Sequence, residues 1–324
     1  MQVFDSSRIY AFMRYKMVYF TLSALLVLAS IFCLATRGLN YGIDFAGGTL
    51  VQVKYTNANA PIEQIREALN ANEITKGASV TEFGGKDEVV IRYTNTSDDV
   101  SSDPAMFVGN LLKNTGSLEV RRVDVVGPKV GAELRQKGIM ALSVSIVLIL
   151  IYVAFRFEWR FGIAAIISQA HDIVIALGVI SFLRLDVNLD TLAALLTILG
   201  YSLNDTIIVF DRIREGVTNS KSNDLNKNID ESISATLSRT FMTSVSTLLA
   251  VLTLFFFGGD MIHGFSIIMI VGIVVGTASS IFIAAPSLVW FGFDISRYRA
   301  QLADKQRKKA EKEKLRALYE KGSV

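Results

Sequence analysis

Six blocks of apolar residues, each long enough to cross a lipid bilayer as a helix, constrain this chain more than any other feature of its sequence. About 20 apolar residues are needed for a helix to span the hydrocarbon core of a bilayer. A soluble protein with 51% hydrophobic residues would normally spread them in shorter runs. The pattern predicts a polytopic α-helical membrane protein with six transmembrane helices. The blocks lie at about 17–35, 138–155, 161–183, 189–210, 238–257 and 264–290.

The first block has two readings, because Arg8, Arg14 and Lys16 precede it as they would in a secretory signal peptide. The run from Met17 to Ala35 is 19 residues long, whereas the apolar region of a signal peptide usually has about 7 to 15 residues. We therefore expect a helix that stays in the mature protein.

Lysine and arginine are concentrated on one side of the predicted membrane. Nineteen of them lie in the N-terminus, in the loops at 156–160 and 211–237, and in the tail from Arg297 onward. The two short loops on the opposite side carry only Arg184. Because basic residues in short loops stay in the cytoplasm, both termini are expected there. The net charge of +3 is too small to indicate a nucleic-acid partner.

Charge and hydropathy together divide the chain into four parts. We expect a cytoplasmic N-terminus with the first transmembrane helix at 1–36, an extracytoplasmic domain at 37–137, a five-helix transmembrane bundle at 138–296 and a basic cytoplasmic tail at 297–324. The tail is interpreted as a charged helix or a disordered segment that serves topology and solubility. Binding of the tail to anionic membrane lipids or to the ribosome is the minor alternative.

The segment 37–137 has the pattern of a small α+β domain. Residues 49–55 and 118–126 alternate as strands do, although the second run loses its alternation at Arg121-Arg122. Between them, Asp103 followed by proline indicates an N-cap and the first residue of a helix. A small sheet covered by two helices is the expected result.

Ionisable side chains inside the apolar blocks mark the candidate functional site. Each costs about 2.5–3.5 kcal/mol at the centre of a membrane helix. Asp205 lies seven residues before Arg212, where the fourth helix leaves the membrane, and is thus roughly 10 Å inside at about 1.5 Å per residue. Arg239 lies near the start of the fifth block. A hairpin of these two helices would bring its guanidinium opposite the Asp205 carboxylate.

Two readings of the Asp205–Arg239 pair stay open from the residues alone. The functional reading is a proton relay, because a low dielectric favours the neutral carboxyl group while a nearby arginine favours the charged form. The alternative is a structural ion pair that locks two helices together. Thr243 lies one turn beyond Arg239 on the same stripe, and Asn204 adjoins Asp205, so both residues would add hydrogen-bonding groups to the pair.

The third block holds a second candidate, the neighbouring residues His171 and Asp172. For His171, helix packing is a better reading than metal binding, because no second histidine or cysteine lies near it in sequence. Asp172 is equally compatible with a relay and with packing, and both residues are treated as supporting polar groups. We expect no metal and no cofactor, with protons as the coupling ion under the relay reading.

An enzymatic reading has little support. The two aspartates Asp172 and Asp205 could form the shared-proton pair of an aspartyl protease. The flanking residues lack the Gly-x-Gly-Asp pattern of intramembrane proteases of that kind, and Arg239 would keep Asp205 charged. No glycine-rich phosphate loop with its lysine is present, so ATP is not expected to bind this chain.

An ordered set of motifs extends over nearly the whole chain, from about 17 to 290. The motifs are Tyr41-Gly42-Ile43-Asp44-Phe45-Ala46-Gly47-Gly48, Val126-Gly127-Pro128, His171-Asp172, Leu199-Gly200-Tyr201-Ser202-Leu203-Asn204-Asp205-Thr206, Phe210-Asp211-Arg212-Ile213-Arg214-Glu215 and Ser238-Arg239-Thr240. This set resembles the SecF family, the accessory subunits of the bacterial Sec protein-export machinery. The resemblance implies a structural role for the signature residues Asp44, Gly47 and Gly48, the two glycines letting backbones approach closely.

The resemblance also implies a role in protein transport. The SecF family belongs to the resistance-nodulation-division transporter superfamily, pairs with SecD to form a twelve-helix unit, and associates with the SecYEG channel in the bacterial cytoplasmic (inner) membrane. Such a unit would use the proton motive force to promote late steps of translocation of a polypeptide. The proton pathway would then include Asp205, Arg239 and Thr243, and the extracytoplasmic domain would be ferredoxin-like.

Two rival functions remain at this point. One is half of an exporter of lipids or small molecules in the same superfamily, whose members usually carry both six-helix halves and large external domains in one chain. The other is a purely structural subunit that steadies the channel.

Overall fold

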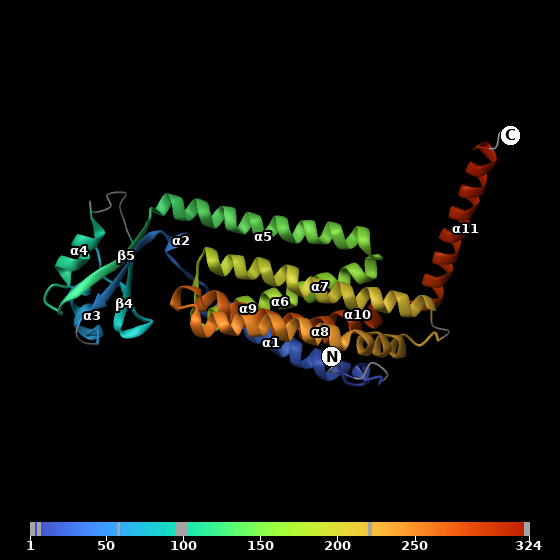
Figure 1. The fold of residues 1–324 in the computed structure, drawn as a ribbon, viewed down its shortest axis with the longest axis horizontal. Coiled ribbons are helices and arrows are strands. Elements are labelled where there is room, and N and C mark those ends of the chain that lie inside the picture. The colour runs from blue at the N-terminus through green and yellow to red at the C-terminus, as the bar shows by residue number, and fades with distance from the viewer. Residues whose placement is uncertain (1–3, 5–7, 57–58, 95–102, 220–221, 321–324) are drawn as a thin grey trace.

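A computed structural model describes residues 4, 8–56, 59–94, 103–219 and 222–320. A bundle of long helices forms the body of the molecule, with a small sheet domain at one end and a single projecting helix at the other (Figure 1). The projecting helix is the charged tail, α11 (Ile295–Glu320).

Among the residues that the structure describes, six helices are long and apolar enough to cross a membrane, as the sequence predicts. The sixth span begins as α9 and continues through a π-helix, η2, into α10. The fold also has a short 3-10 helix, η1 (Phe12–Tyr15), ahead of the first span. The helices of the bundle are α1 (Lys16–Arg37), α5 (Pro128–Arg156), α6 (Trp159–Leu183), α7 (Leu189–Asn219), α8 (Leu225–Phe257), α9 (Asp260–Ser279), η2 (Ser280–Ala284) and α10 (Ala285–Trp290).

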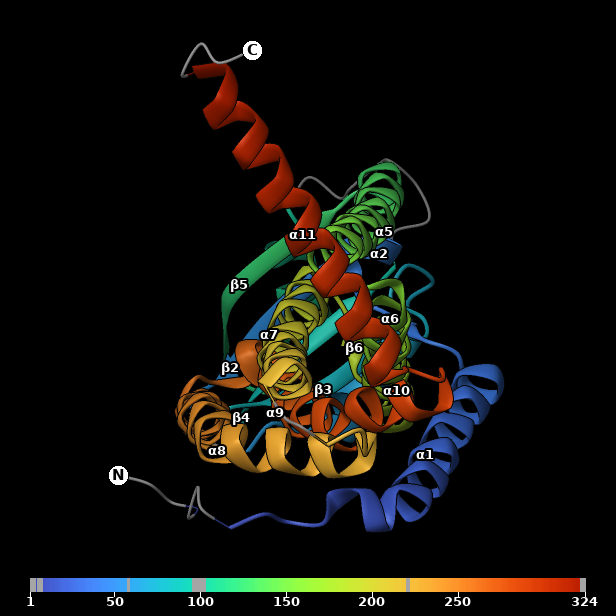
Figure 2. The ribbon, with the colours of Figure 1, turned by 90° about the vertical axis from the view of Figure 1, so that its right-hand side faces the viewer.

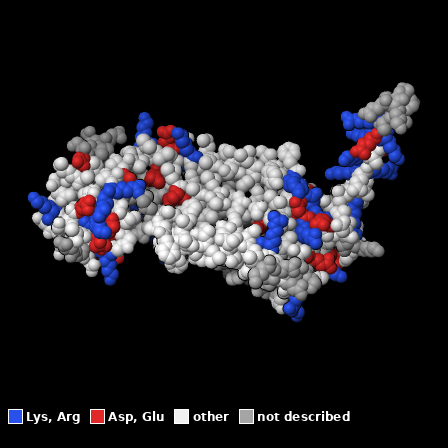
Figure 3. Space-filling view, in the orientation of Figure 1, with Lys and Arg blue, Asp and Glu red and all other residues white. Residues whose placement is uncertain are grey.

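Charged side chains lie almost entirely at the two ends of the molecule. On the face shown in Figure 3 they cover the sheet domain at one end and the helix ends and tail at the other, with a broad uncharged belt between. A belt of this kind fits a hydrocarbon core that excludes unpaired charges. The chain is therefore a multi-pass membrane protein.

The helices divide into an inner and an outer set. In the apolar windows of α6, α7 and the α9–α10 span, 50%, 50% and 56% of the residues are buried. The corresponding windows of α1, α5 and α8 are only 6%, 11% and 17% buried. Figure 2 shows α1 and α8 on opposite sides of the bundle, with α5 above. The outer helices thus offer most of their surface to lipid or to another protein.

The external domain is a four-stranded antiparallel sheet with strand order β3-β4-β2-β5. Its chain order of strand, helix, two strands, helix and strand is that of a ferredoxin-like fold, as expected. Valine and isoleucine side chains of β2 and β4 pack with α3 and α4 in one core. The elements are β2 (Gly48–Tyr55), α3 (Ile62–Asn70), β3 (Ser79–Phe83), β4 (Gly85–Tyr93), α4 (Pro104–Leu111) and β5 (Leu118–Val126).

One local prediction in this domain is confirmed, and one irregularity of the sequence pattern is explained. The Asp103 side chain accepts hydrogen bonds from the backbone N–H groups of Ala105 and Met106, and thus caps α4. The pairing of β2 with β5 shifts register between Gln52 and Val53, so Arg121 of β5 has no partner in the ladder. This β-bulge explains why the alternation of the strand breaks there.

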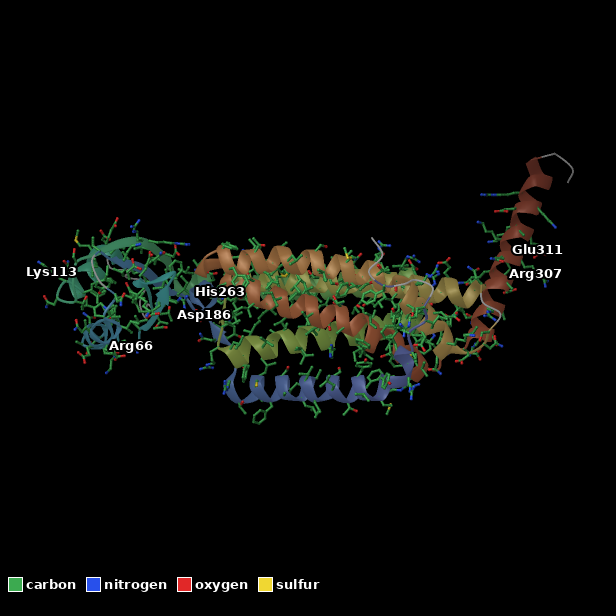
Figure 4. The ribbon with its side chains drawn as sticks, turned by 60° about the horizontal axis from the view of Figure 1, so that its bottom comes forward. Arg66, Lys113, Asp186, His263, Arg307 and Glu311 are labelled. Carbon is green, nitrogen blue, oxygen red and sulfur yellow. The ribbon has the colours of Figure 1, made fainter. Side chains whose placement is uncertain are left out.

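The domain joins the bundle through a compact polar junction. Strand β1 (Asn40–Tyr41) pairs in parallel with β6 (Asp186–Val187), which lies in the loop between α6 and α7. Asp186 also forms an ion pair with Arg92 of β4. An Asp44 carboxylate oxygen in α2 (Ile43–Ala46) accepts a hydrogen bond of 3.0 Å from the Leu189 N–H, at the start of α7. Figure 4 shows Asp186 and His263 at this boundary.

The paired glycines lie where the chain leaves the junction for the sheet. Gly47 has φ +75°, and a Cβ atom built on it would lie 2.7 Å from the Pro128 Cα atom at the start of α5. Gly131, one turn into α5, would place a Cβ atom 2.7 Å from the Gly47 N atom. The two backbones therefore touch with no room for a side chain on either.

We predict that Gly47→Ala destabilises the protein more than Gly38→Ala. Both residues have positive φ values with ψ near 180°, a region that costs other residues about 1–3 kcal/mol. A Cβ atom at Gly38 would have no neighbour within 4 Å, so that variant suffers the backbone strain alone. Thermal unfolding of the detergent-solubilised protein compares the two. Equal losses would show that the contact with α5 is unimportant.

Candidate functional site

Asp205 is buried in the centre of the bundle. Its side chain projects from α7 and is 1% exposed. The Ser244 hydroxyl of α8 lies close to the carboxyl group. One carboxyl oxygen, Oδ2, is buried with no hydrogen-bond partner among the residues that the structure describes. A carboxylate in this position would leave part of its charge unsatisfied, which a protonated carboxyl group would avoid.

A small cluster of hydroxyl groups connects Asp205 to the sixth span. Ser244 shares a hydrogen bond of 2.7 Å with the Thr277 hydroxyl of α9. The Tyr201 hydroxyl donates to Ser244 across 3.3 Å. Three helices, α7, α8 and α9, thus meet at this cluster around the carboxyl group.

Arg239 lies on α8, close enough to act electrostatically on Asp205, but its side chain is exposed. No ion pair joins the two within the described ranges. Thr243 is also exposed, and its hydroxyl bonds to the carbonyl oxygens of Arg239 and Thr240 in its own helix. The polar stripe that the sequence places on α8 is therefore present, but it faces outward from this chain and not into the hairpin.

The neighbouring stripe of α7 is exposed as well. Asn204 is exposed although Asp205 beside it is buried, because successive residues of a helix are turned by about 100°. Ala193, Thr197 and Gly200 lie on the same exposed stripe as Asn204, and all are small or polar. Stripes of small residues let membrane helices approach closely. The outer faces of α7 and α8 together have the composition of a helix-packing surface.

His171 and Asp172 form a second buried polar centre on α6. Asp172 is 1% exposed, and its Oδ1 atom lies 2.9 Å from His171 Nδ1. Its Oδ2 atom accepts hydrogen bonds from Ser202 of α7, at 2.5 Å, and from Ser279 of α9, at 2.8 Å. Ser168, one turn before Asp172, donates to Ser279 at 3.1 Å. This carboxylate is satisfied on both oxygens, unlike that of Asp205.

Sequence reasoning missed these serines as a group, because they come from three helices far apart in the chain. A local signal for one part was available in the Gly272–Gly276 pair, which predicts close helix packing. That packing is present, since a Cβ atom at Gly276 would lie 2.9 Å from the Ser202 Cβ atom. The π-helix begins four residues later at Ser280, and such bulges are frequent at functional sites.

The described residues contain no group of three or more histidine, cysteine or acidic side chains arranged to hold a metal ion. The polar chemistry of the bundle is thus that of carboxyl, hydroxyl, imidazole and guanidinium groups. These groups bind and transfer protons, and they also hold helices together.

Six membrane helices, a ferredoxin-like external domain and carboxyl groups buried in the bundle define a multi-pass transport-type membrane protein. Residues 107–294 match the family described as "Protein export membrane protein SecD/SecF, C-terminal", and residues 34–58 match "SecD/SecF GG Motif". The chain belongs to the SecD/SecF family, on its SecF branch.

Relatives and solved structures agree with this assignment. The chain is 45% identical to protein translocase subunit SecF of Helicobacter pylori strain J99 over 324 residues, which is 100% of both chains. It is 46% identical to SecF of Vibrio alginolyticus over 287 residues, 88% of this chain and 90% of the relative. A crystal structure of SecDF, described as a translocon-associated membrane protein from Thermus, matches with a TM-score of 0.80 and 36% identity. That match covers 89% of this chain and 39% of the Thermus chain.

We predict that Asp172→Asn destabilises the fold while Asp205→Asn does not. In the first variant, the amide nitrogen that replaces a carboxylate oxygen could not accept the hydrogen bonds that the serines or the histidine now donate, a loss of about 1–3 kcal/mol. The second variant changes a carboxyl group whose Oδ2 atom has no partner in the described structure. Chemical denaturation of both variants in detergent measures the difference. A reversed order would contradict the assignment of satisfied and unsatisfied carboxyl groups.

Proposed function

We propose that this chain is a subunit of a proton-coupled protein translocase, in which Asp205 binds and releases the coupling proton. The single observation that carries the proposal is the buried Asp205 carboxyl group with one unpartnered oxygen and a guanidinium nearby that does not pair with it, all within the described residues. The relatives are named protein translocase subunit SecF, and this name supplies the kind of cargo. They describe transport subunits and support this reading over an enzymatic one.

The unpaired geometry suits a proton-binding site better than a fixed ion pair would. A tight pair with Arg239 would hold Asp205 in the charged form throughout the cycle. With the guanidinium on the outer face of α8, a small rotation of that helix would change the field at Asp205. Such a movement would favour release of the proton in one state and its uptake in the other. Thr243, one turn from Arg239, lies on the same outer face and would take part there.

The exposed polar face of α7 and α8 supports a second six-helix unit as partner. Arg239 and Asn204 would each be costly in contact with lipid tails, because hydrocarbon offers no hydrogen bonds. Covering them with another polar helix surface would remove that cost and close the space around Asp205. We propose SecD as the partner, since the matching Thermus SecDF chain is more than twice as long as this one.

The distribution of charge supports an orientation with both termini in the cytoplasm of a bacterial inner membrane. At the end opposite the sheet domain, Arg156 and Arg214 both pair with Asp211, which ties the α5–α6 corner to α7. The basic tail leaves from the same end, next to membrane lipids. The sheet domain would then face the SecYEG channel exit and the emerging polypeptide on the other side.

The energy available from protons is adequate for small steps. One proton crossing a potential of 100 mV releases about 2.3 kcal/mol. This amount is comparable to the free-energy difference between two conformations of a domain that are both populated. Each proton would therefore bias such an equilibrium, and repeated cycles would be needed to move a long polypeptide.

We predict that Asp205→Asn and Arg239→Met each abolish the stimulation of secretion by a proton gradient. An asparagine side chain cannot release a proton, and a methionine keeps an apolar stem while removing the charge that would drive release. Secretion into inverted membrane vesicles, with and without an uncoupler, measures the gradient-dependent fraction. Ser246→Ala serves as control, since that hydroxyl bonds only to its own helix among the described residues. If both variants keep full gradient-dependent secretion while the complex stays intact, the proton-coupled role is contradicted. A purely structural role of the subunit would then remain.

We also predict that Gly200→Leu weakens association with the partner subunit. Gly200 lies on the outer stripe of α7, where a Cβ atom would have no neighbour within 4 Å in this chain. A leucine side chain there would not clash within the isolated chain, but it would sterically prevent a partner helix from packing closely. Ala24→Leu on the exposed face of α1, across the bundle, is the control (Figure 2). Co-purification with the partner should fall for the first variant only, and equal recovery would place the interface elsewhere.

A further inference from the structure

The proposed function uses one of the two carboxyl groups buried at the centre of the bundle and leaves the other unexplained. Asp172 and its neighbour His171 lie on α6, and their side chains are 1% and 11% exposed. An ionised carboxylate and an imidazole so far from water are costly to keep, and such groups in membrane helices are usually functional.

The hydrogen bonds around Asp172 define its charge. Ser202 and Ser279 donate to Oδ2, and Ser168 in turn donates to Ser279, which leaves the Ser279 proton directed at the carboxylate. A carboxylate that accepts from two hydroxyls is stabilised in its ionised form. His171 Nδ1 then supplies the third donor, to Oδ1, at 2.9 Å.

This arrangement defines the tautomer of His171. When Nδ1 carries the proton and donates it to Asp172, the other ring nitrogen, Nε2, presents a lone pair. Nε2 is buried and has no hydrogen-bond partner in the part of the chain that the structure describes. A buried basic nitrogen with a free lone pair, beside a carboxylate already held by three donors, is a vacant position for one proton.

The imidazole is among the groups that line a pocket of about 190 Å³ between α1, α6 and α9, while Nε2 itself is buried. Among the described residues that line it, His171 is the only side chain that carries charge when protonated, and Tyr19 of α1 is the only other titratable group. Tyr19 is itself stacked on Phe282 of the π-helix, with ring centroids 3.9 Å apart. Asp205 lies elsewhere, one turn beyond Ser202 on α7 and toward α8.

We propose that His171 and Asp172 form a second proton-binding site, in which the proton binds Nε2 of His171 and Asp172 serves as its counter-ion. Binding converts a neutral imidazole and a carboxylate, of net charge −1, into an imidazolium–carboxylate pair of net charge zero. The proton comes from solvent water. No other bond is made or broken.

The second site shares a structural element with the first. Asp172 binds Ser279, and the Asp205 cluster reaches Thr277, two residues earlier on α9. The π-helix starts directly after this segment. A proton bound at either site would therefore act on the same turn of α9. Proton binding at His171 does not depend on the proposed export function; only the coupling through α9 rests on it.

The test uses the fact that the chain has only two histidines. In His263→Gln, the single remaining imidazole is His171, and ¹⁵N-histidine labelling of the full chain in lipid nanodiscs reports its two nitrogens separately. At alkaline pH we expect protonated Nδ1 and unprotonated Nε2. On acidification across about pH 8 to 5, the range in which histidines usually titrate, we expect conversion to imidazolium.

Two results in this variant would overturn the proposal. One is the opposite tautomer, with the proton on Nε2. The other is an imidazole that stays neutral over the whole range. Neither depends on activity, and neither needs a substitution at the site itself.

Asp172→Asn, made in the same background, tests the role of the counter-ion. Without the carboxylate, the ratio of protonated to neutral imidazole at a fixed acidic pH should fall about tenfold or more, as for the loss of an interaction of about 1.4 kcal/mol. An unchanged ratio would remove Asp172 from the site. Asp205→Asn is the matched control and should leave proton binding at His171 in place. In this control, secretion tests the proposed role of Asp205, and the titration of His171 tests the second proton-binding site. The two measurements are independent, so either proposal can fail without the other.

Discussion

The structure depends on one constraint, which is that hydrocarbon cannot hydrogen-bond, so every polar group at membrane depth needs a partner inside the protein. Asp172 meets this constraint within the chain, through two serines and a histidine. The Asp205 Oδ2 atom does not meet it among the described residues, and Arg239 and Asn204 are exposed on the outer face of this chain. These groups are the basis of the proposed proton-binding site and of the proposed partner surface.

Helix α9 holds the inner bundle together because its residues are small at the level of the two carboxyl groups. Gly272 and Gly276 let α7 approach until Ile198 and Ser202 touch the α9 backbone. Thr277 and Ser279 then supply hydroxyls to the two polar centres, one toward α8 and one toward α6. Close packing is thus what allows one turn of helix to reach both sites.

Helix α7 links this region to the external domain. Its first N–H group is bound by Asp44, and the preceding strand pairs with β1 and forms an ion pair with the sheet. From Leu189 to Asp205 the helix runs about 24 Å without a break. A tilt of α7 at the buried carboxyl group would therefore displace the junction, where Gly47 lies in close contact with the start of α5. In this way a change at the proposed proton site would be transmitted along α7 to the sheet domain.

The amino-acid sequence alone determined the six membrane helices and the small α+β domain, because length, apolar composition and alternation are local properties of the chain. The break in alternation at Arg121-Arg122 marked an irregularity in β5, and the structure identifies it as a bulge. Only the tertiary structure decided which way the polar side chains face. The rotation of α8 about its axis follows from its packing on α9, where Ser244 meets Thr277, and this packing turns Arg239 outward. The two serines that donate to Asp172 come from α7 and α9, and no spacing within either helix could have brought them together.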